Sequence, residues 1–132
     1  MRAVIQRVAR ASVTSEGKVL GRVGRGLLVF VGIGPGDDPA KARWMAEKIL
    51  RMRIFEDGEG KMNLSVEEAG GALPVVSQFT LYADAVKGNR PGFSGAAPPD
   101  VARPLVEEMV RHLRSMSRIP VETGSFGARM EV

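Results

Sequence analysis

The chain has 132 residues and a formal net charge of +4 at pH 7; 44% of its residues are hydrophobic and 26% are charged. These values are typical of one globular domain, and no apolar run reaches the roughly 18 residues that a membrane span needs. The sequence contains no cysteine and one histidine, His112, which excludes disulfide bonds, a thiolate nucleophile and a multi-histidine metal site.

The first 34 residues predict β-structure. The segments are MRAVIQRV, then ASVTSEGKVLGRVGRG with a turn at Glu16 and Gly17, then LLVFVGIG. Because the chain opens on a strand pattern and shows no signal-peptide pattern, we expect a cytoplasmic protein that does not associate with membranes.

A helix is expected next, over residues 39–55. Asp38 is placed to cap its first turn, and Pro39 suits the first helical position. Helical spacing predicts one apolar stripe that packs on a sheet, formed by Ala42, Met45, Ala46, Ile49, Leu50 and Arg53. Trp44 and the methionines are interpreted as core or flanking residues.

Residues 55–84 predict two further strands. A turn at Asp57 and Gly58 precedes a short strand at residues 62–66, and the strand ALPVVSQFTLYAD follows at residues 72–84. The glycines of this region match no phosphate-binding motif, so we interpret them as turns.

Residues 85–100, AVKGNRPGFSGAAPPD, predict a long loop. Loops of this length in a compact domain usually carry binding or catalytic residues. Lys87, Asn89 and Arg90 beside Phe93 suit the binding of a phosphate and a ring, and an ordinary surface loop is the alternative.

A second amphipathic helix is expected at residues 99–116, with Leu105, Met109, Leu113 and Met116 as its apolar stripe. His112 lies near the edge of that stripe and is interpreted as structural or solvated. A last strand follows, broken by Gly124 and Gly127. The whole pattern predicts a single α+β domain, in which two main helices pack against a curled, barrel-like antiparallel or mixed sheet.

Polar residues interrupt the apolar strand VVSQFTLYAD at Ser77, Gln78 and Thr80. One interpretation is simple alternation, in which these side chains point outward while Phe79 and Leu81 point inward. The other is a strand that frays here and aims its backbone N–H groups at a ligand, where they can stabilise an oxyanion. The residues alone favour alternation.

Several motifs resemble the D-aminoacyl-tRNA deacylase (D-tyrosyl-tRNA deacylase) family, in order and over essentially the whole chain. They are QRV at 6–8, ASV at 11–13, GLLVFVGI at 26–33, GKMNLSV at 60–66, SQFTL at 77–81, NRPGFS at 89–94 and TGSFGARMEV at 123–132. The resemblance implies a homodimer, without metal or organic cofactor, that hydrolyses D-aminoacyl esters at the 3′ end of tRNA. Glycyl-tRNA mischarged on alanine tRNA is a further implied substrate.

The resemblance also implies roles for particular residues. Ser77, Gln78, Phe79 and Thr80 match the catalytic strand, whose backbone N–H groups at Phe79 and Thr80 would bind the reacting carbonyl while Gln78 positions the substrate. The 2′-hydroxyl of the terminal adenosine would assist water attack. Matching substrate-binding positions are Arg7, Lys87, Asn89, Arg90, Pro91, Phe93, Phe126 and Met130.

The sequence departs from the family at its C-terminal end. Family members continue into an NxGP motif that excludes L-amino acids, whereas residues 1–132, expected to form one deacylase-like domain, stop at RMEV. A catalytically inactive RNA-binding or interaction module is therefore the alternative function, and the excess of arginine over lysine is compatible with it.

Overall fold

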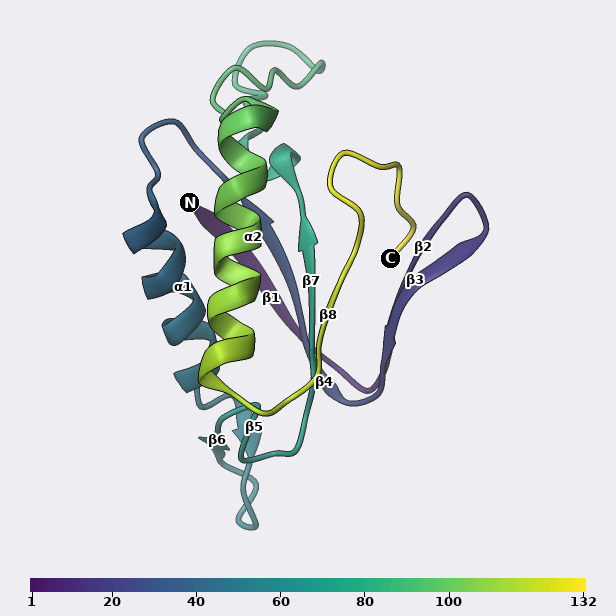
Figure 1. The fold of residues 1–132 in the computed structure, drawn as a ribbon, viewed down its shortest axis with the longest axis vertical. Coiled ribbons are helices and arrows are strands. Elements are labelled where there is room, and N and C mark those ends of the chain that lie inside the picture. Colours follow the sequence, from purple (N-terminus) through teal and green to yellow (C-terminus); the bar gives the residue numbers. More distant parts are fainter.

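The computed structural model describes residues 1–132 as helices lying on one face of a β-sheet, with a hairpin on the other side (Figure 1). The helices are α1 (Pro39–Arg51), the 3₁₀ helix η1 (Phe79–Tyr82) and α2 (Pro99–Met116). The strands are β1 (Arg2–Val8), β2 (Ala11–Ser15), β3 (Lys18–Val23), β4 (Gly26–Gly32), β5 (Phe55–Glu56), β6 (Met62–Leu64), β7 (Leu73–Ser77) and β8 (Val121–Thr123). None of the helices combines the length and the apolar character that a membrane crossing requires.

The main sheet is mixed and has the strand order β1-β4-β7-β8. β1 runs antiparallel to β4, whereas β4, β7 and β8 are parallel to one another. The remaining strands form the hairpins β2–β3 and β5–β6. The expected α+β class with two helices on a mixed sheet is confirmed, although the sheet stays open and does not close into a barrel.

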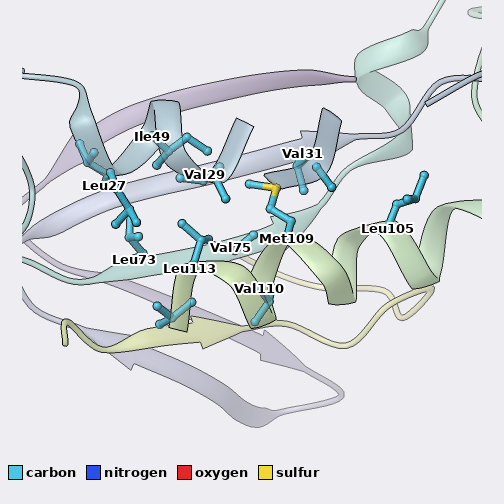
Figure 2. Packing of buried hydrophobic residues seen from close by; sticks show 14 of the residues in the cluster. Leu27, Val29, Val31, Ile49, Leu73, Val75, Leu105, Met109, Val110 and Leu113 are labelled. Carbon is cyan, nitrogen blue, oxygen red and sulfur yellow. The ribbon is translucent and has the colours of Figure 1, made fainter. Parts of the chain in front are cut away.

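The core lies between the sheet and the two long helices (Figure 2). Alternate residues of β4, Leu27, Val29 and Val31, are almost fully buried and face the helices. Met109 and Leu113 of α2 pack against them and are also fully buried. Burying each such side chain contributes roughly 1.5–3 kcal/mol, so this layer fixes both helices on the sheet.

A smaller apolar cluster covers part of the opposite face. Val13 of β2 packs there with Leu28 and Val76, and Met130 joins them from the C-terminal segment. Thr14 and Glu131 exchange two backbone hydrogen bonds of 2.8 Å, which tie that segment to the hairpin. These contacts hold the last residues of the chain next to the end of β7.

The predicted local signals are largely confirmed. The carboxylate of Asp38 accepts a hydrogen bond from the Lys41 N–H at 2.8 Å, and Pro39 begins α1. Glu16 and Gly17 have φ angles of 50° and 75°, which is the left-handed pair that a tight hairpin turn needs.

Two expected positions differ. The helix α1 ends at Arg51, so Arg53 is not part of its stripe; it is exposed and its Nε donates to the Asn63 carbonyl at 2.9 Å. Met116 is 39% exposed because it is the last residue of α2, where the helix ends. Trp44, expected as a core or flanking residue, is a flanking one: it is 58% exposed, and the Lys48 ammonium lies 5.5 Å from its ring centroid.

Candidate functional site

The strand β7 ends at Ser77, beside the end of its partner strand β4 at Gly32. Its parallel pairing with β4 stops at the pair Val31 and Ser77, and the Gln78 N–H then donates to the Val31 carbonyl at 2.7 Å. Beyond that bond the chain turns into η1. The expected strand over residues 72–84 is therefore wrong beyond Ser77, and so is simple outward alternation of its polar residues, because β4 offers no further backbone to pair with.

Two glycines allow η1 to lie against the end of β4. A Cβ atom on Gly32 would lie 2.9 Å from the Gln78 carbonyl oxygen, and one on Gly34 would lie 2.7 Å from the Tyr82 hydroxyl oxygen. Real Cβ atoms essentially never approach other atoms so closely. The absence of side chains at both positions is thus what lets the turn pack there.

The first turn of η1 presents free backbone donors. Its first internal hydrogen bond is donated by Leu81 to the Gln78 carbonyl at 3.3 Å, so the N–H groups of Phe79 and Thr80 precede it and have no intrahelical acceptor. The Gln78 side-chain amide donates to the Thr80 hydroxyl oxygen. No histidine or carboxylate hydrogen-bonds that hydroxyl, so Thr80 lacks the base that would activate it as a nucleophile.

A largely apolar pocket of about 600 Å³ opens beside this turn. It lies between the end of β7, the start of α2 and the C-terminal segment. Its lining residues are Val31, Ile33, Val76, Ser77, Gln78, Phe79, Phe93, Ala96, Ala97, Pro98, Pro99, Ala102, Val106, Phe126, Gly127, Ala128, Met130 and Val132. An apolar pocket with a few polar groups at one side is the usual form of a small-ligand site.

Six of the predicted site residues meet in this pocket. They are Ser77, Gln78, Phe79, Phe93, Phe126 and Met130. The rings of Phe79 and Phe93 lie edge to face with centroids 5.1 Å apart, although these residues come from η1 and the long loop. Thr80 follows in η1 without lining the pocket itself.

The other predicted residues lie outside the pocket. Lys87, Asn89, Arg90 and Pro91 are exposed in the loop, which is closed at its base by two backbone hydrogen bonds of 2.8 Å between Asp84 and Gly92. The guanidinium of Arg7 donates to the Ile54 carbonyl at 2.9 Å and borders a different hollow. Within one chain, the structure does not bring these five residues to the pocket.

Charged and ring-stacking contacts support the far end of η1. Arg2 donates to the Leu81 carbonyl at 2.9 Å, and its guanidinium lies 4.3 Å from the Tyr82 ring centroid. Burial raises the pKa of Tyr82, Asp37 raises it further, and Arg2 acts in the opposite direction. The phenol therefore stays neutral. Arg2 contacts η1 at Leu81 and Tyr82, which do not line the pocket.

The remaining candidate groups for chemistry lie elsewhere. His112 does not line the pocket; its Nε2 lies 3.3 Å from a carboxylate oxygen of Glu47, so it links the two long helices. No group of three or more His, Asp or Glu residues is arranged to hold a metal ion. The polar side chains that line the pocket are consequently the Ser77 hydroxyl and the Gln78 amide, and the free backbone N–H groups of Phe79 and Thr80 lie beside them.

Residues 4–132 match the family model described as D-Tyr-tRNA(Tyr) deacylase. The chain belongs to this family. Proteins named D-aminoacyl-tRNA deacylase from Chlorobaculum parvum and Thermomicrobium roseum are 58% and 54% identical to it over 132 residues, which are 89% and 85% of their lengths.

Two solved structures share the fold of this chain. The structure of "c-Myc DNA Unwinding Element Binding Protein" is 40% identical and superposes with a TM-score of 0.93 over 99% of this chain and 89% of that one. A second, described as "probable eukaryotic D-amino acid tRNA deacylase", has a TM-score of 0.80 at 21% identity over 98% and 90%, which shows the shared fold.

Sequence reasoning missed one wall of the pocket in this D-Tyr-tRNA(Tyr) deacylase family member. Pro98, Pro99, Ala102 and Val106 line it from the start of α2, and Ile33 lines it from the chain after β4. The available signal was that α2 begins directly after the Gly- and Pro-rich loop. Its stripe of small residues, however, gives no indication of which cavity it faces.

Proposed function

We propose that this chain hydrolyses the ester bond of D-aminoacyl-tRNA and releases the free D-amino acid and tRNA. The observation that carries the proposal is the apolar pocket beside the free N–H groups of Phe79 and Thr80, in a member of a deacylase family. The chain supplies no Cys, and its one His lies outside the pocket. A site built on positioning and oxyanion stabilisation needs neither residue.

In the proposed mechanism, the terminal adenosine occupies the apolar part of the pocket. Phe93, Phe126 and Met130 offer aromatic and thioether surfaces on which a base can pack. Ser77 and Gln78 line the polar side of the pocket, where the aminoacyl group would lie. This arrangement places the ester at the first turn of η1.

The reaction then uses water and the substrate's own 2′-hydroxyl. Water, assisted by the 2′-hydroxyl of the adenosine, adds to the ester carbonyl carbon, and negative charge develops on the carbonyl oxygen. The N–H groups of Phe79 and Thr80 donate to that oxygen. Collapse of the intermediate breaks the bond to the ribose oxygen, which takes up a proton, and the amino acid leaves.

We propose the remaining roles from the family resemblance. Lys87, Asn89, Arg90 and Pro91 would contact the tRNA end from the exposed loop, and Arg7 would act near a neighbouring subunit. Glycine mischarged on alanine tRNA would be a further substrate. The protein would work in the cytoplasm, where aminoacyl-tRNA is found.

We also propose a homodimer, in which a second copy covers the sheet face that the hairpin leaves open. Val4 is 50% exposed on that face, and Gln6, Leu28 and Phe30 border a hollow of about 740 Å³ beside it. Exposed apolar surface of this kind marks interaction sites. Light scattering after size-exclusion chromatography would give twice the chain mass; the mass of one chain would contradict the dimer.

The activity is tested with matched D- and L-tyrosyl-tRNA at low enzyme concentration. Loss of the D ester would support the deacylase function, and loss of the L ester as well would show that residues 1–132 do not enforce chirality. Salt-dependent tRNA binding without loss of either ester would favour the inactive RNA-binding module.

A further inference from the structure

A second groove of about 510 Å³ adjoins the pocket along α2. Ser77, Val106 and Phe126 line both cavities and so form the boundary between them. The groove runs between α2 and the chain that follows β8, two segments that lie beside the same part of the sheet in Figure 1. A ligand that extends out of the pocket past these residues enters the groove.

The groove is basic because the face of α2 that lines it carries three arginines and one glutamate. Arg103, Arg111 and Arg114 line it, and Glu107 is its one acidic lining residue. Arg103 and Arg114 are in no ion pair, whereas Arg111 pairs with Glu108. An excess of arginine with few acidic partners attracts anions.

Arg103 is held in a defined position at the boundary. Its guanidinium lies 5.1 Å from the centroid of the Phe126 ring, which also lines the pocket. Stacking orders the planar group and leaves its N–H donors at the edge free to bind phosphate oxygens. Arg114, eleven residues further along α2 and so about 16 Å away along the helix axis, donates to the Val121 carbonyl at 2.8 Å.

We propose that this groove binds the phosphate groups of the nucleotides that precede the terminal adenosine of tRNA. The inference rests on the proposed function, because it assumes that the adenosine occupies the adjoining pocket. An RNA strand that leaves the pocket carries one negative charge per nucleotide, and the groove offers arginines along its length. Backbone contacts of this kind position a nucleic acid without reading its sequence.

The first experiment measures binding of a fluorescein-labelled oligoribonucleotide ending in CCA, by anisotropy, so that no catalysis is required. Arg103→Gln is expected to weaken binding roughly tenfold and to lower the slope of log K against log salt by about 0.7, the value for one phosphate on a single strand. Glu107→Gln, which removes the acidic lining residue, is expected to strengthen binding.

Two variants separate charge in the groove from other effects. Arg51→Gln makes the same charge change at an exposed position at the end of α1, outside the groove, and should leave affinity unchanged. Arg103→Lys keeps the charge and should recover most of the affinity. Unchanged binding in Arg103→Gln, or equal losses in Arg103→Gln and Arg51→Gln, would overturn the proposal.

A second experiment compares hydrolysis of D-tyrosyl-tRNA with hydrolysis of D-tyrosyl-adenosine, which has no phosphate. Arg103→Gln should raise KM for the tRNA ester and leave kcat/KM for the adenosine ester unchanged. An equal loss on both substrates would overturn the phosphate assignment. A wild-type protein that hydrolyses neither ester, yet binds the oligoribonucleotide through Arg103, would refute the deacylase function and confirm the groove.

Discussion

Replacing Phe79 by proline tests the backbone mechanism directly, because it removes one of the two proposed oxyanion donors. The structure accommodates proline here: Phe79 is the first residue of η1, and Gln78 before it has φ −145° and ψ 87°, outside the helical region that proline disfavours. Loss of one such donor typically lowers kcat by about 100- to 1,000-fold, or roughly 3–4 kcal/mol.

The matched control is Phe79→Ala, which also loses the ring but keeps the N–H. The ring is 58% exposed and contacts Phe93 edge to face, an interaction of about 1 kcal/mol, so the alanine variant should lose only about fivefold in activity. Single-turnover hydrolysis of D-tyrosyl-tRNA gives both rates, and circular dichroism confirms folding. If folded Pro and Ala variants have rates within about threefold of each other, the oxyanion role of this N–H is refuted.

Three further substitutions probe the support of the site and the core. Gly32→Ala places a methyl group against the turn after β7, so it should lower activity and reduce the free energy of unfolding by about 1–3 kcal/mol. Gly24→Ala is the control: no atom lies within 4 Å of the new carbon, so activity and stability should stay unchanged. Met109→Ala leaves a cavity and should lower the free energy of unfolding, measured in urea, by about 2–5 kcal/mol. Met116 is 39% exposed, so Met116→Ala should lower it by well under about 1 kcal/mol. The carboxylate of Asp57 accepts hydrogen bonds from backbone N–H groups, which hold the pKa of Asp57 below its usual value. The stability that this carboxylate contributes is present at neutral pH and is lost as pH falls through the folded pKa. Asp57→Asn should therefore reduce the pH dependence of the urea midpoint between pH 5 and about 3. A variant as pH-dependent as the wild type would contradict that assignment.

Much of the architecture could be predicted because it depends on neighbouring residues. Asp38 caps the helix that it precedes, and Glu16 and Gly17 form the turn between β2 and β3. The spacing of Leu105, Met109 and Leu113 defines a helix face before any partner is known. The resemblance of the motifs to a deacylase family likewise needed only the order of residues, and the family match over residues 4–132 confirms it.

The site depended on contacts between distant segments. Residues 72–84 are expected to form one strand despite their polar interruptions, yet the strand stops at Ser77 because β4, its partner, ends at Gly32. No local property of the polar residues distinguishes alternation from a turn, since the choice depends on which backbone remains available for pairing.

The sequence by itself therefore determined the class of fold, the hairpin at Glu16 and Gly17, the two long helices and the family. Only the tertiary structure decided that residues 79–82 form a 3₁₀ turn, that Phe93 and Phe126 meet at one pocket, and that Arg103 lies at its boundary. The physical reason is range: caps, turns and periodicity act within a few residues, whereas the pocket is formed by segments that only sheet pairing and core packing bring together.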